Sequence, residues 1–237
     1  AKPGTSSISY DGTGDYLSVA TSSDWNVYGT SFTVEFWFYM NSLSTSFDLL
    51  AGNTAVDSNG WNIQIQNASP DKLCFLVGNG SSWDINTTDG SGYTISTGTW
   101  YHVALVKNVS AWTLYVDGTS QGTGTSAGND YDGTLQIGAS TLWSGRDFDG
   151  YMDEIRISNS ARYTTTFTPQ TTQFTADANT KLLIHSDYTG GLGADSSGNY
   201  NNFAATNLVA TDQMIDTPTN NFCTLNPLDE WQSPAFS

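Results

Sequence analysis

The chain is dominated by short segments in which apolar and polar side chains alternate with a period of two. Every second residue from Phe32 to Met40 is Phe, Val or Met, and the residues between them are Thr, Glu, Trp and Tyr. Further segments of this kind cover residues 61–65, 100–107, 112–116, 135–137, 151–158 and 182–185. This period places alternate side chains on opposite faces of a strand. No stretch has convincing helical periodicity, so the sequence predicts an all-β protein.

The residues between these segments favour many tight turns. Of the 237 residues 23 are Gly, and charged residues make up only 13%, about half the usual share of roughly 25%. Ser, Thr, Asn and Gly supply the polarity instead, a composition typical of strands and turns. The length suits one large β-sandwich.

The composition and the periodicity of the sequence change after Asp187. Residues 189–199 are rich in Gly and Ser, and residues 200–237 carry scattered apolar side chains without a period. Such a segment cannot build a core alone. We therefore predict one β-sandwich domain over residues 1–188, and an extended tail over residues 189–237 that wraps the sandwich or leads to a further domain.

The net charge of −16, with only seven Lys and Arg, argues against two classes of partner. Nucleic-acid binding needs a basic surface, and docking to an anionic membrane needs one too. No apolar run is long enough to span a bilayer. The acidity therefore favours solubility or an affinity for cations.

Two acidic residues are predicted to lie among apolar side chains. Asp153 shares a strand face with Tyr151, Ile155 and Ile157 if the alternation is regular, and Asp15 begins a similar segment. A buried carboxylate is costly unless a proton, a partner or a metal satisfies it. Two explanations are open: a calcium ion, or hydrogen bonds and ion pairs within the protein.

Five segments together resemble the laminin-G-like, concanavalin A-type jelly roll of the lectin and glucanase superfamily. They are residues 10–17, 32–37, 100–104, 114–118 and 150–157. The resemblance implies two antiparallel sheets, one of them concave, with binding loops at a rim. The expected fold is an all-β jelly-roll sandwich of two antiparallel sheets with an extended C-terminal tail.

The same resemblance bears on the metal. In related glucanase sandwiches the position of Asp153 supplies a side-chain ligand to a structural calcium ion. The Gly-rich turn at residues 11–14 offers carbonyl oxygens next to Asp15. We therefore expect a structural Ca²⁺ held by Asp153 and Asp15. The alternative is that these acids accept backbone hydrogen bonds or pair with an arginine such as Arg156, although regular alternation puts Arg156 on the other face.

A second resemblance concerns the part of the chain after residue 160. Residues 161–169, 180–185, 195–199 and 217–229 resemble structural proteins of marine bacteriophages, in which a laminin-G-like module is followed by such a segment and often by another sandwich. The resemblance implies a component of the virion surface or tail, and a chain that is a piece of a longer protein.

Catalytic patterns are missing from the sequence. Related glucanases place acid and nucleophile on one strand as Glu-x-Asp-x-x-Glu, and no such triplet occurs here. Glu35 has no second carboxylate two or four residues away. His102 belongs to a strand, His185 ends one, and no Gly-x-Ser-x-Gly turn is present. We expect that the chain is not an enzyme.

Sugar binding needs aromatic faces together with polar groups for hydroxyls. The candidates near loops are Trp83, Asp84, Tyr131, Trp143 and Arg146. Each of them could instead anchor its loop.

Trp37 and Tyr39 alternate away from the apolar face of their strand. They could line a second surface, either a glycan groove or a contact between subunits.

The leading hypothesis is a non-catalytic carbohydrate-binding or adhesive module of a phage virion or tail surface protein, with a glycan or cell-surface polysaccharide as its partner. The alternative is a structural decoration or assembly domain that contacts other virion subunits, copies of itself included, and binds no glycan. We expect no membrane insertion. A cellular, extracellular adhesin is a third reading of the same sequence.

Overall fold

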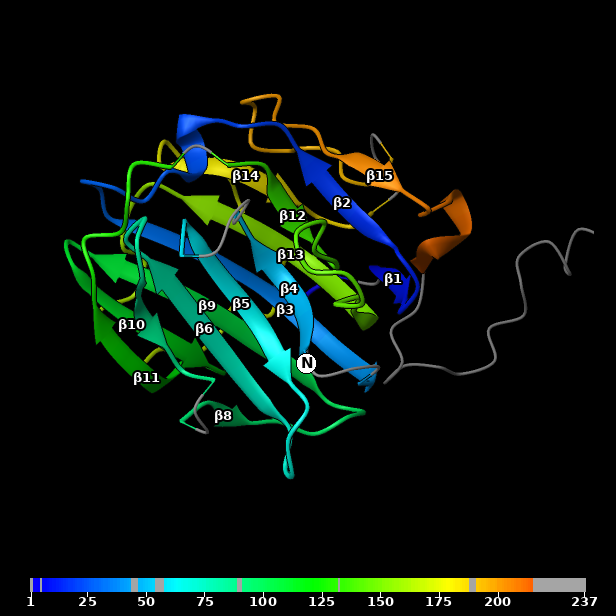
Figure 1. Cartoon of the computed structure of the whole chain (residues 1–237). Helices are drawn as coiled ribbons and strands as arrows, with labels where there is room; N and C mark the ends of the chain where they lie inside the picture. Colours follow the sequence, from blue (N-terminus) through cyan, green and yellow to red (C-terminus); the bar gives the residue numbers. More distant parts are fainter. Residues whose placement is uncertain are drawn as a thin grey trace, which may run out of the picture.

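The computed structural model describes residues 2–4, 6–43, 47–53, 58–88, 91–131, 133–187 and 191–214. These residues form two antiparallel sheets that lie face to face, with β4 (Phe47–Gly52) and β5 (Trp61–Gln66) of one sheet in front of β3 (Phe32–Ser42) and β9 (Trp100–Asn108) of the other in Figure 1. Two single-turn 3-10 helices, η1 (Ser23–Trp25) and η2 (Ala210–Asp212), are the only helices among the described residues. The predicted all-β jelly-roll sandwich is confirmed.

The first sheet, here sheet A, has the strand order β11-β10-β9-β3-β13-β1-β16, with β14 also paired to β13. Its strands are β1 (Ser7–Asp11), β3 (Phe32–Ser42), β9 (Trp100–Asn108), β10 (Ala111–Val116), β11 (Thr119–Thr125), β13 (Asp149–Ser158), β14 (Thr180–Ile184) and β16 (Gln213–Met214). The longest strands, β3 and β13, lie next to each other in the middle.

The second sheet, sheet B, has the order β15-β2-β12-β4-β5-β6-β7, with β8 also paired to β6. Its strands are β2 (Tyr16–Val19), β4 (Phe47–Gly52), β5 (Trp61–Gln66), β6 (Lys72–Gly78), β7 (Trp83–Asn86), β8 (Tyr93–Thr94), β12 (Leu135–Ile137) and β15 (Ala204–Thr206).

The core lies between the sheets and follows the period of two. Phe36 and Phe38 of β3 point into it, as do Ile63 and Ile65 of β5. Each fully buried side chain of this size stabilises the fold by about 1.5–3 kcal/mol. The residues that alternate with them point out of the sandwich, and these outward positions carry the polar chemistry of the molecule.

The outward face of sheet A is closed by the chain itself. Trp37, the residue expected to line an open surface, is only 5% exposed and packs with Phe174 and Leu183. Further along the sheet, Tyr163 and Phe167 stack on each other at 3.6 Å between ring centroids and pack over Tyr115. The sheet surface at Trp37 is therefore not an open groove, which corrects that expectation.

A β-bulge in β13 corrects the predicted orientation of Asp153. Asp153 pairs with Trp37 and Arg156 pairs with Glu35, so Glu154 and Ile155 together lie opposite the single residue Phe36. Glu154 has a φ of 51°, in the left-handed region. Regular alternation fails at this point, because the extra residue moves each following side chain to the opposite face of the sheet from the one that alternation predicts.

As a result, Asp153 and Arg156 lie on the same, outward side of sheet A, next to Trp37 and Glu35, whereas Ile155 and Ile157 belong to the core.

The described part of the predicted tail joins the sandwich. β15 pairs with β2 in sheet B, and β16 pairs with β1 in sheet A. Phe203 and Leu208 are buried in the main core. The first part of the segment thus extends both sheets, and residues 215–237 lie outside the described residues.

Candidate functional site

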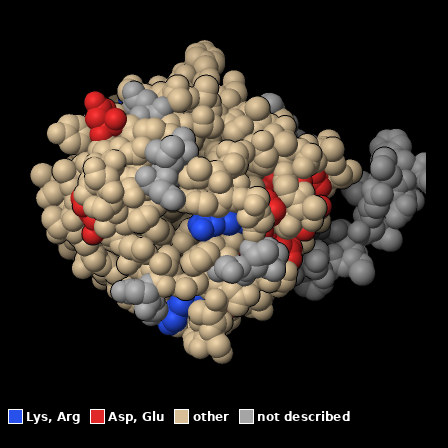
Figure 2. Space-filling model, in the orientation of Figure 1, with Lys and Arg blue, Asp and Glu red and all other residues tan. Residues whose placement is uncertain are grey.

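A pocket on the outward face of sheet B brings together three of the residues singled out in the sequence. It has a cavity volume of about 330 Å³. Its lining residues come from four neighbouring strands and two loops: Phe47, Gln64, Leu76, Trp83, Thr88, Trp143 and Arg146. In Figure 2 a basic group shows near the middle of this face, over β4, and most of the surrounding surface is uncharged.

The alternation of the strands puts these side chains outside. In β5 the core residues Ile63 and Ile65 flank Gln64, which therefore points outward. In β6 Phe75 and Val77 flank Leu76 in the same way. The floor of the pocket is thus fixed by the same pattern that builds the core.

The guanidinium of Arg146 packs against two aromatic rings. Its Cζ lies 4.3 Å from the ring centroid of Trp143 and 4.8 Å from that of Phe47. Its Nη1 donates a hydrogen bond to Gln64 Oε1 at 3.0 Å, and its carbonyl accepts one from the N–H of Leu49 at 3.2 Å. A stacked, hydrogen-bonded guanidinium is fixed in orientation before any ligand binds.

The loop that carries Trp143 is also ordered by hydrogen bonds. Ser140 Oγ accepts from the backbone N–H groups of Leu142 and Trp143, both at 3.2 Å. Gln136 in β12 makes two hydrogen bonds to Thr141. Its amide nitrogen donates to the Thr141 hydroxyl, and its amide oxygen accepts from the Thr141 N–H. The Trp143 ring is therefore presented on a preorganised turn.

The other two predicted ligand residues do not line this pocket. Asp84 accepts hydrogen bonds from Asn79 at 2.5 Å and from Ser126 at 2.7 Å, so it connects β7 to the segment after β11. Tyr131 lies against Gly133 instead.

Sequence reasoning missed four of the lining residues: Phe47, Gln64, Leu76 and Thr88. The outward position of Gln64 between two Ile residues was a readable signal, but nothing in the sequence showed which loops reach it.

The carboxylate of Asp153 is buried with a lysine. Lys2 Nζ lies 2.5 Å from Asp153 Oδ2, and it also donates to the carbonyls of Ser6 and Pro3 at 2.5 and 2.8 Å. The ring of Trp100 lies 5.5 Å from the same ammonium. Burial raises the pKa of Asp153 to about 7, although the positive charge of Lys2 opposes this.

Asp15 lies in different surroundings. Its carboxylate accepts a hydrogen bond from the N–H of Asp11 at 3.0 Å. Burial raises the pKa of Asp15, and the negative charges of Asp11 and Asp212 add to this while the Asp11 N–H opposes it.

These surroundings test how the predicted calcium fits. Among the described residues no three His, Cys, Asp or Glu side chains form a group that could hold a metal ion. One carboxylate and two carbonyls around a single point are oxygen ligands of the kind calcium prefers. The Lys2 ammonium already lies among these oxygens, so calcium bound to Asp153 would have to displace it. Calcium binding by Asp153 and Asp15 stays a prediction.

A second buried charge cluster holds the outward face of sheet A closed. Glu35 is fully buried and accepts hydrogen bonds from Arg156 at 2.7 and 2.9 Å and from the Tyr163 hydroxyl at 2.8 Å. His102 Nε2 lies 3.2 Å from it. Burial by itself raises the pKa of Glu35, but the His102 hydrogen bond and the Arg156 charge outweigh it and lower the pKa. The cluster fastens Tyr163 to the sheet.

The chain belongs to the concanavalin A-like lectin/glucanases superfamily, whose laminin-G family model matches residues 11–166. This agrees with the two-sheet sandwich and with the segments that carried the resemblance. A comparison with curated protein sequences gives no match. None of the described helices is long and apolar enough to cross a membrane.

Among solved structures, the chain is similar to a candidate carbohydrate-binding protein of Bacteroides ovatus (20% identity, TM-score 0.65), with 87% of this chain and 59% of that one covered. It is also similar to a heptameric SAP-like pentraxin of Limulus polyphemus (16% identity, TM-score 0.52; 79% and 98% covered).

A third similar structure is the pair of domains LG4-5 of the mouse laminin α1 chain (16% identity, TM-score 0.50; 70% and 47% covered). The chain thus spans about three fifths of the Bacteroides protein and about half of the laminin fragment.

Proposed function

We propose that this chain is a non-catalytic carbohydrate-binding module whose ligand lies in the pocket of Trp83, Trp143 and Arg146. The observation that carries the proposal is the convergence of two tryptophans, a fixed guanidinium, an amide and a hydroxyl in one pocket of about 330 Å³. Sugars present both an apolar C–H face and hydroxyls, and this lining matches both. The similar Bacteroides ovatus protein, a carbohydrate-binding candidate, supports the same class.

Each group has a role in the proposal. A tryptophan ring packs against the C–H face of a pyranose. Arg146 and Gln64 donate and accept hydrogen bonds to ring hydroxyls, and Thr88 adds one hydroxyl at the pocket edge. None of the described lining residues is a carboxylate, so the pocket offers no acid–base pair for glycoside hydrolysis. This supports binding without catalysis.

We also propose that the module is part of a phage virion or tail surface protein. The support is the resemblance of residues 161–169, 180–185 and 195–199 to structural proteins of marine phages. In that setting the glycan would be a polysaccharide of the host surface. The alternative, an assembly domain that contacts other virion subunits, predicts no glycan binding.

A glycan-array screen with and without calcium tests the binding proposal. Binding in either condition supports it, and no binding in both would sink it in favour of the assembly domain. The best glycan then gives the dissociation constant for variants. Trp143→Ala and Trp83→Ala are each expected to weaken binding by roughly 2 kcal/mol, or about thirtyfold.

The matched control is Tyr200→Ala, because Tyr200 is an exposed aromatic (85%) outside the pocket. It should bind like the wild type. Arg146→Lys keeps the positive charge but loses the planar stack, so it should weaken binding as well. Equal affinity for all four variants and the wild type would place the ligand elsewhere.

A further inference from the structure

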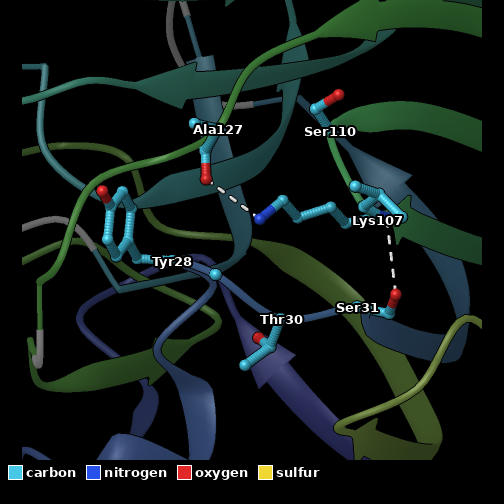
Figure 3. A pocket seen from close by; sticks show the side chains of 8 residues that line it. Tyr28, Thr30, Ser31, Lys107, Ser110 and Ala127 are labelled. Carbon is cyan, nitrogen blue, oxygen red and sulfur yellow. Dashed lines mark hydrogen bonds between the residues drawn. The ribbon is translucent and has the colours of Figure 1, made fainter.

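A second pocket lies at one end of the sandwich and shares no lining residue with the first. It has a cavity volume of about 360 Å³. It is formed by the segment before β3, the end of β9, the β9–β10 turn and the segment after β11: Tyr28, Gly29, Thr30, Ser31, Lys107, Val109, Ser110 and Ala127. The first and the last of these segments are distant in sequence from the β9–β10 hairpin, and both meet it at this pocket (Figure 3).

Lys107 occupies a position that the strand pattern reserves for the core. It continues the inward series of Val103 and Leu105 in β9, and it pairs across the sheet with the core residue Phe32. Only 1% of Lys107 is exposed. A lysine at an inward position is costly to bury, which indicates that the site needs its ammonium.

The ammonium is held by backbone oxygens. It donates to the carbonyl of Val27 and, at 2.9 Å, to that of Ala127, and its nitrogen lies 6.0 Å from the ring centroid of Trp112. Among the described residues no carboxylate lies within ion-pair distance of it. Burial lowers the pKa of Lys107, with no opposing contribution from an acid.

Carbonyl dipoles therefore satisfy two of its three N–H groups without balancing its charge.

The rest of the pocket combines hydroxyls with apolar surface. Figure 3 shows the ammonium of Lys107 extending toward the middle of the pocket, between Ala127, Tyr28 and Thr30. Ser31 and Ser110 add hydroxyls to the wall. Tyr28 is 54% exposed and Val109 is 75% exposed, which makes them the apolar rim.

We propose that this pocket binds a sugar residue that carries a carboxylate, with the carboxylate on Lys107 and the sugar ring on Tyr28. The unbalanced buried charge calls for an anion, because a ligand carboxylate would supply the missing counter-charge in a site of low dielectric. The hydroxyls and the exposed tyrosine then suit the remainder of an acidic sugar. The choice of a sugar rests on the carbohydrate-binding function proposed above, whereas the choice of an anion rests on Lys107 alone.

The acidity of the chain does not prevent such binding. At physiological ionic strength charges separated by more than about 8 Å are largely screened. Asp130, on a neighbouring loop, accepts a hydrogen bond from Asn26 at 2.5 Å. Asn26 lies two residues before Tyr28, which forms the rim of the pocket. A carboxylate bound directly to a buried ammonium is screened much less than these surface charges.

The test is a titration of the whole chain, followed by two-dimensional amide NMR, with three probes: methyl glucuronide, methyl glucoside and acetate. Methyl glucuronide is expected to shift the amide signals of residues 28–31, 107–110 and 127. Methyl glucoside and acetate should each bind at least about tenfold more weakly, because the glucoside lacks the carboxylate and acetate lacks the sugar ring. Glucuronide that shifts none of these signals would overturn the proposal, as would equal affinity for the glucoside.

Variants separate this pocket from the first one. Lys107→Met should lose the preference for glucuronide over glucoside, and Tyr28→Ala should weaken glucuronide binding, while the control Tyr200→Ala, at an exposed aromatic outside both pockets, should leave both unchanged. Tyr28→Ala changes an exposed side chain, so it stays informative even where Lys107→Met fails to fold. Loss of glucuronide binding in Trp143→Ala alone would overturn this proposal and support the first pocket. Loss of glucuronide binding in Tyr28→Ala alone, with no glycan bound at the pocket of Trp143, would support this proposal and overturn the first.

Discussion

At the scale of single residues, three of the seven cationic side chains of this chain act inside the protein. Arg156 pairs with Glu35, Lys2 pairs with Asp153, and the Lys107 ammonium is held by carbonyls. Each of these three side chains is less than a tenth exposed. A buried ion pair contributes little over an apolar pair, but the loss of one partner leaves an uncompensated charge. Single substitutions in these pairs therefore have large effects.

Replacing Glu35 by Gln should destabilise the fold by about 3–5 kcal/mol, because it leaves Arg156 buried without its carboxylate. Denaturant unfolding of both proteins measures the difference. The control is Asp177→Asn, whose partner Arg162 lies in a more exposed ion pair and which should cost about 1 kcal/mol or less. Similar losses in both variants would contradict the internal role of Glu35.

The lowered pKa of Glu35 also fixes the direction of a pH effect. A carboxyl group whose pKa is lower in the folded state contributes stability above its unfolded value of 4.5. This contribution is lost as the pH falls through the folded pKa. The wild type should therefore lose more stability on acidification than Glu35→Gln does.

Calcium is expected to raise the thermal unfolding temperature of the wild type and to have no effect on Asp153→Asn. The reason is that the carboxylate of Asp153 and the carbonyls of Pro3 and Ser6 would form the oxygen ligands. Unfolding with calcium and with chelator measures this. Lys2→Met should strengthen the calcium effect, because it removes the competing ammonium. An equal loss from the chelator in wild type and Asp153→Asn would show that Asp153 is not a ligand.

At the scale of elements, the seven segments with a period of two became seven of the sixteen described strands, the two longest among them, and the alternation failed at the bulge in β13. The strands over 32–40, 61–65, 100–107 and 112–116 are where the alternation placed them. The face of Asp153 could not be predicted, because the bulge depends on the left-handed backbone at Glu154, a residue with no preference for it. Alternation is a property of one strand, whereas a bulge is defined by how that strand pairs with its neighbour, here β13 with β3.

The candidate site was predictable in part for the same reason. Trp143 and Arg146 stood out as an aromatic and a cation in one short loop. Their meeting with Trp83 depends on β4, β5 and β6 lying between them, which is a matter of strand order. Strand order cannot be derived from alternation, since every strand carries the same period.

The segment that closes sheet A approaches the β10–β11 turn closely. A Cβ atom on Gly118 would lie 1.8 Å from the carbonyl oxygen of Phe167, and the φ of Gly118 is +76°. Gly118→Ala should therefore destabilise the protein by more than the roughly 1–2 kcal/mol of left-handed strain alone. The control is Gly198→Ala, with a φ of +88° and nothing within 4 Å. Equal unfolding free energies for the two variants would refute the close approach.

At the scale of the whole molecule, the sandwich is completed by residues beyond the matched family region. β14, β15 and β16 all lie after residue 166, and β15 and β16 each extend one sheet. Figure 1 shows β15 and the segments around it along the edge next to β2. The stable unit of the described chain is therefore longer than the segment that defines the family.

A chain shortened to residue 188 should be less stable than one that ends at Met214. It loses the buried side chains of Phe203 and Leu208 and the pairing of two strands. Burial of the two side chains alone contributes roughly 3–6 kcal/mol. Urea unfolding of the two chains measures the loss. Equal stability would support a domain boundary at residues 188 and 189.

The internal placement of cations has a consequence for proteolysis. Trypsin cleaves after Lys and Arg unless Pro follows, which excludes the bond between Lys2 and Pro3, and the targets Lys107 and Arg156 are buried. A protease of this specificity therefore reaches these two targets only after the sandwich opens. Cleavage after Lys107 or Arg156 would report global opening of the molecule, whereas cleavage after the partly exposed Lys72 or Lys181 would report local motion of a strand.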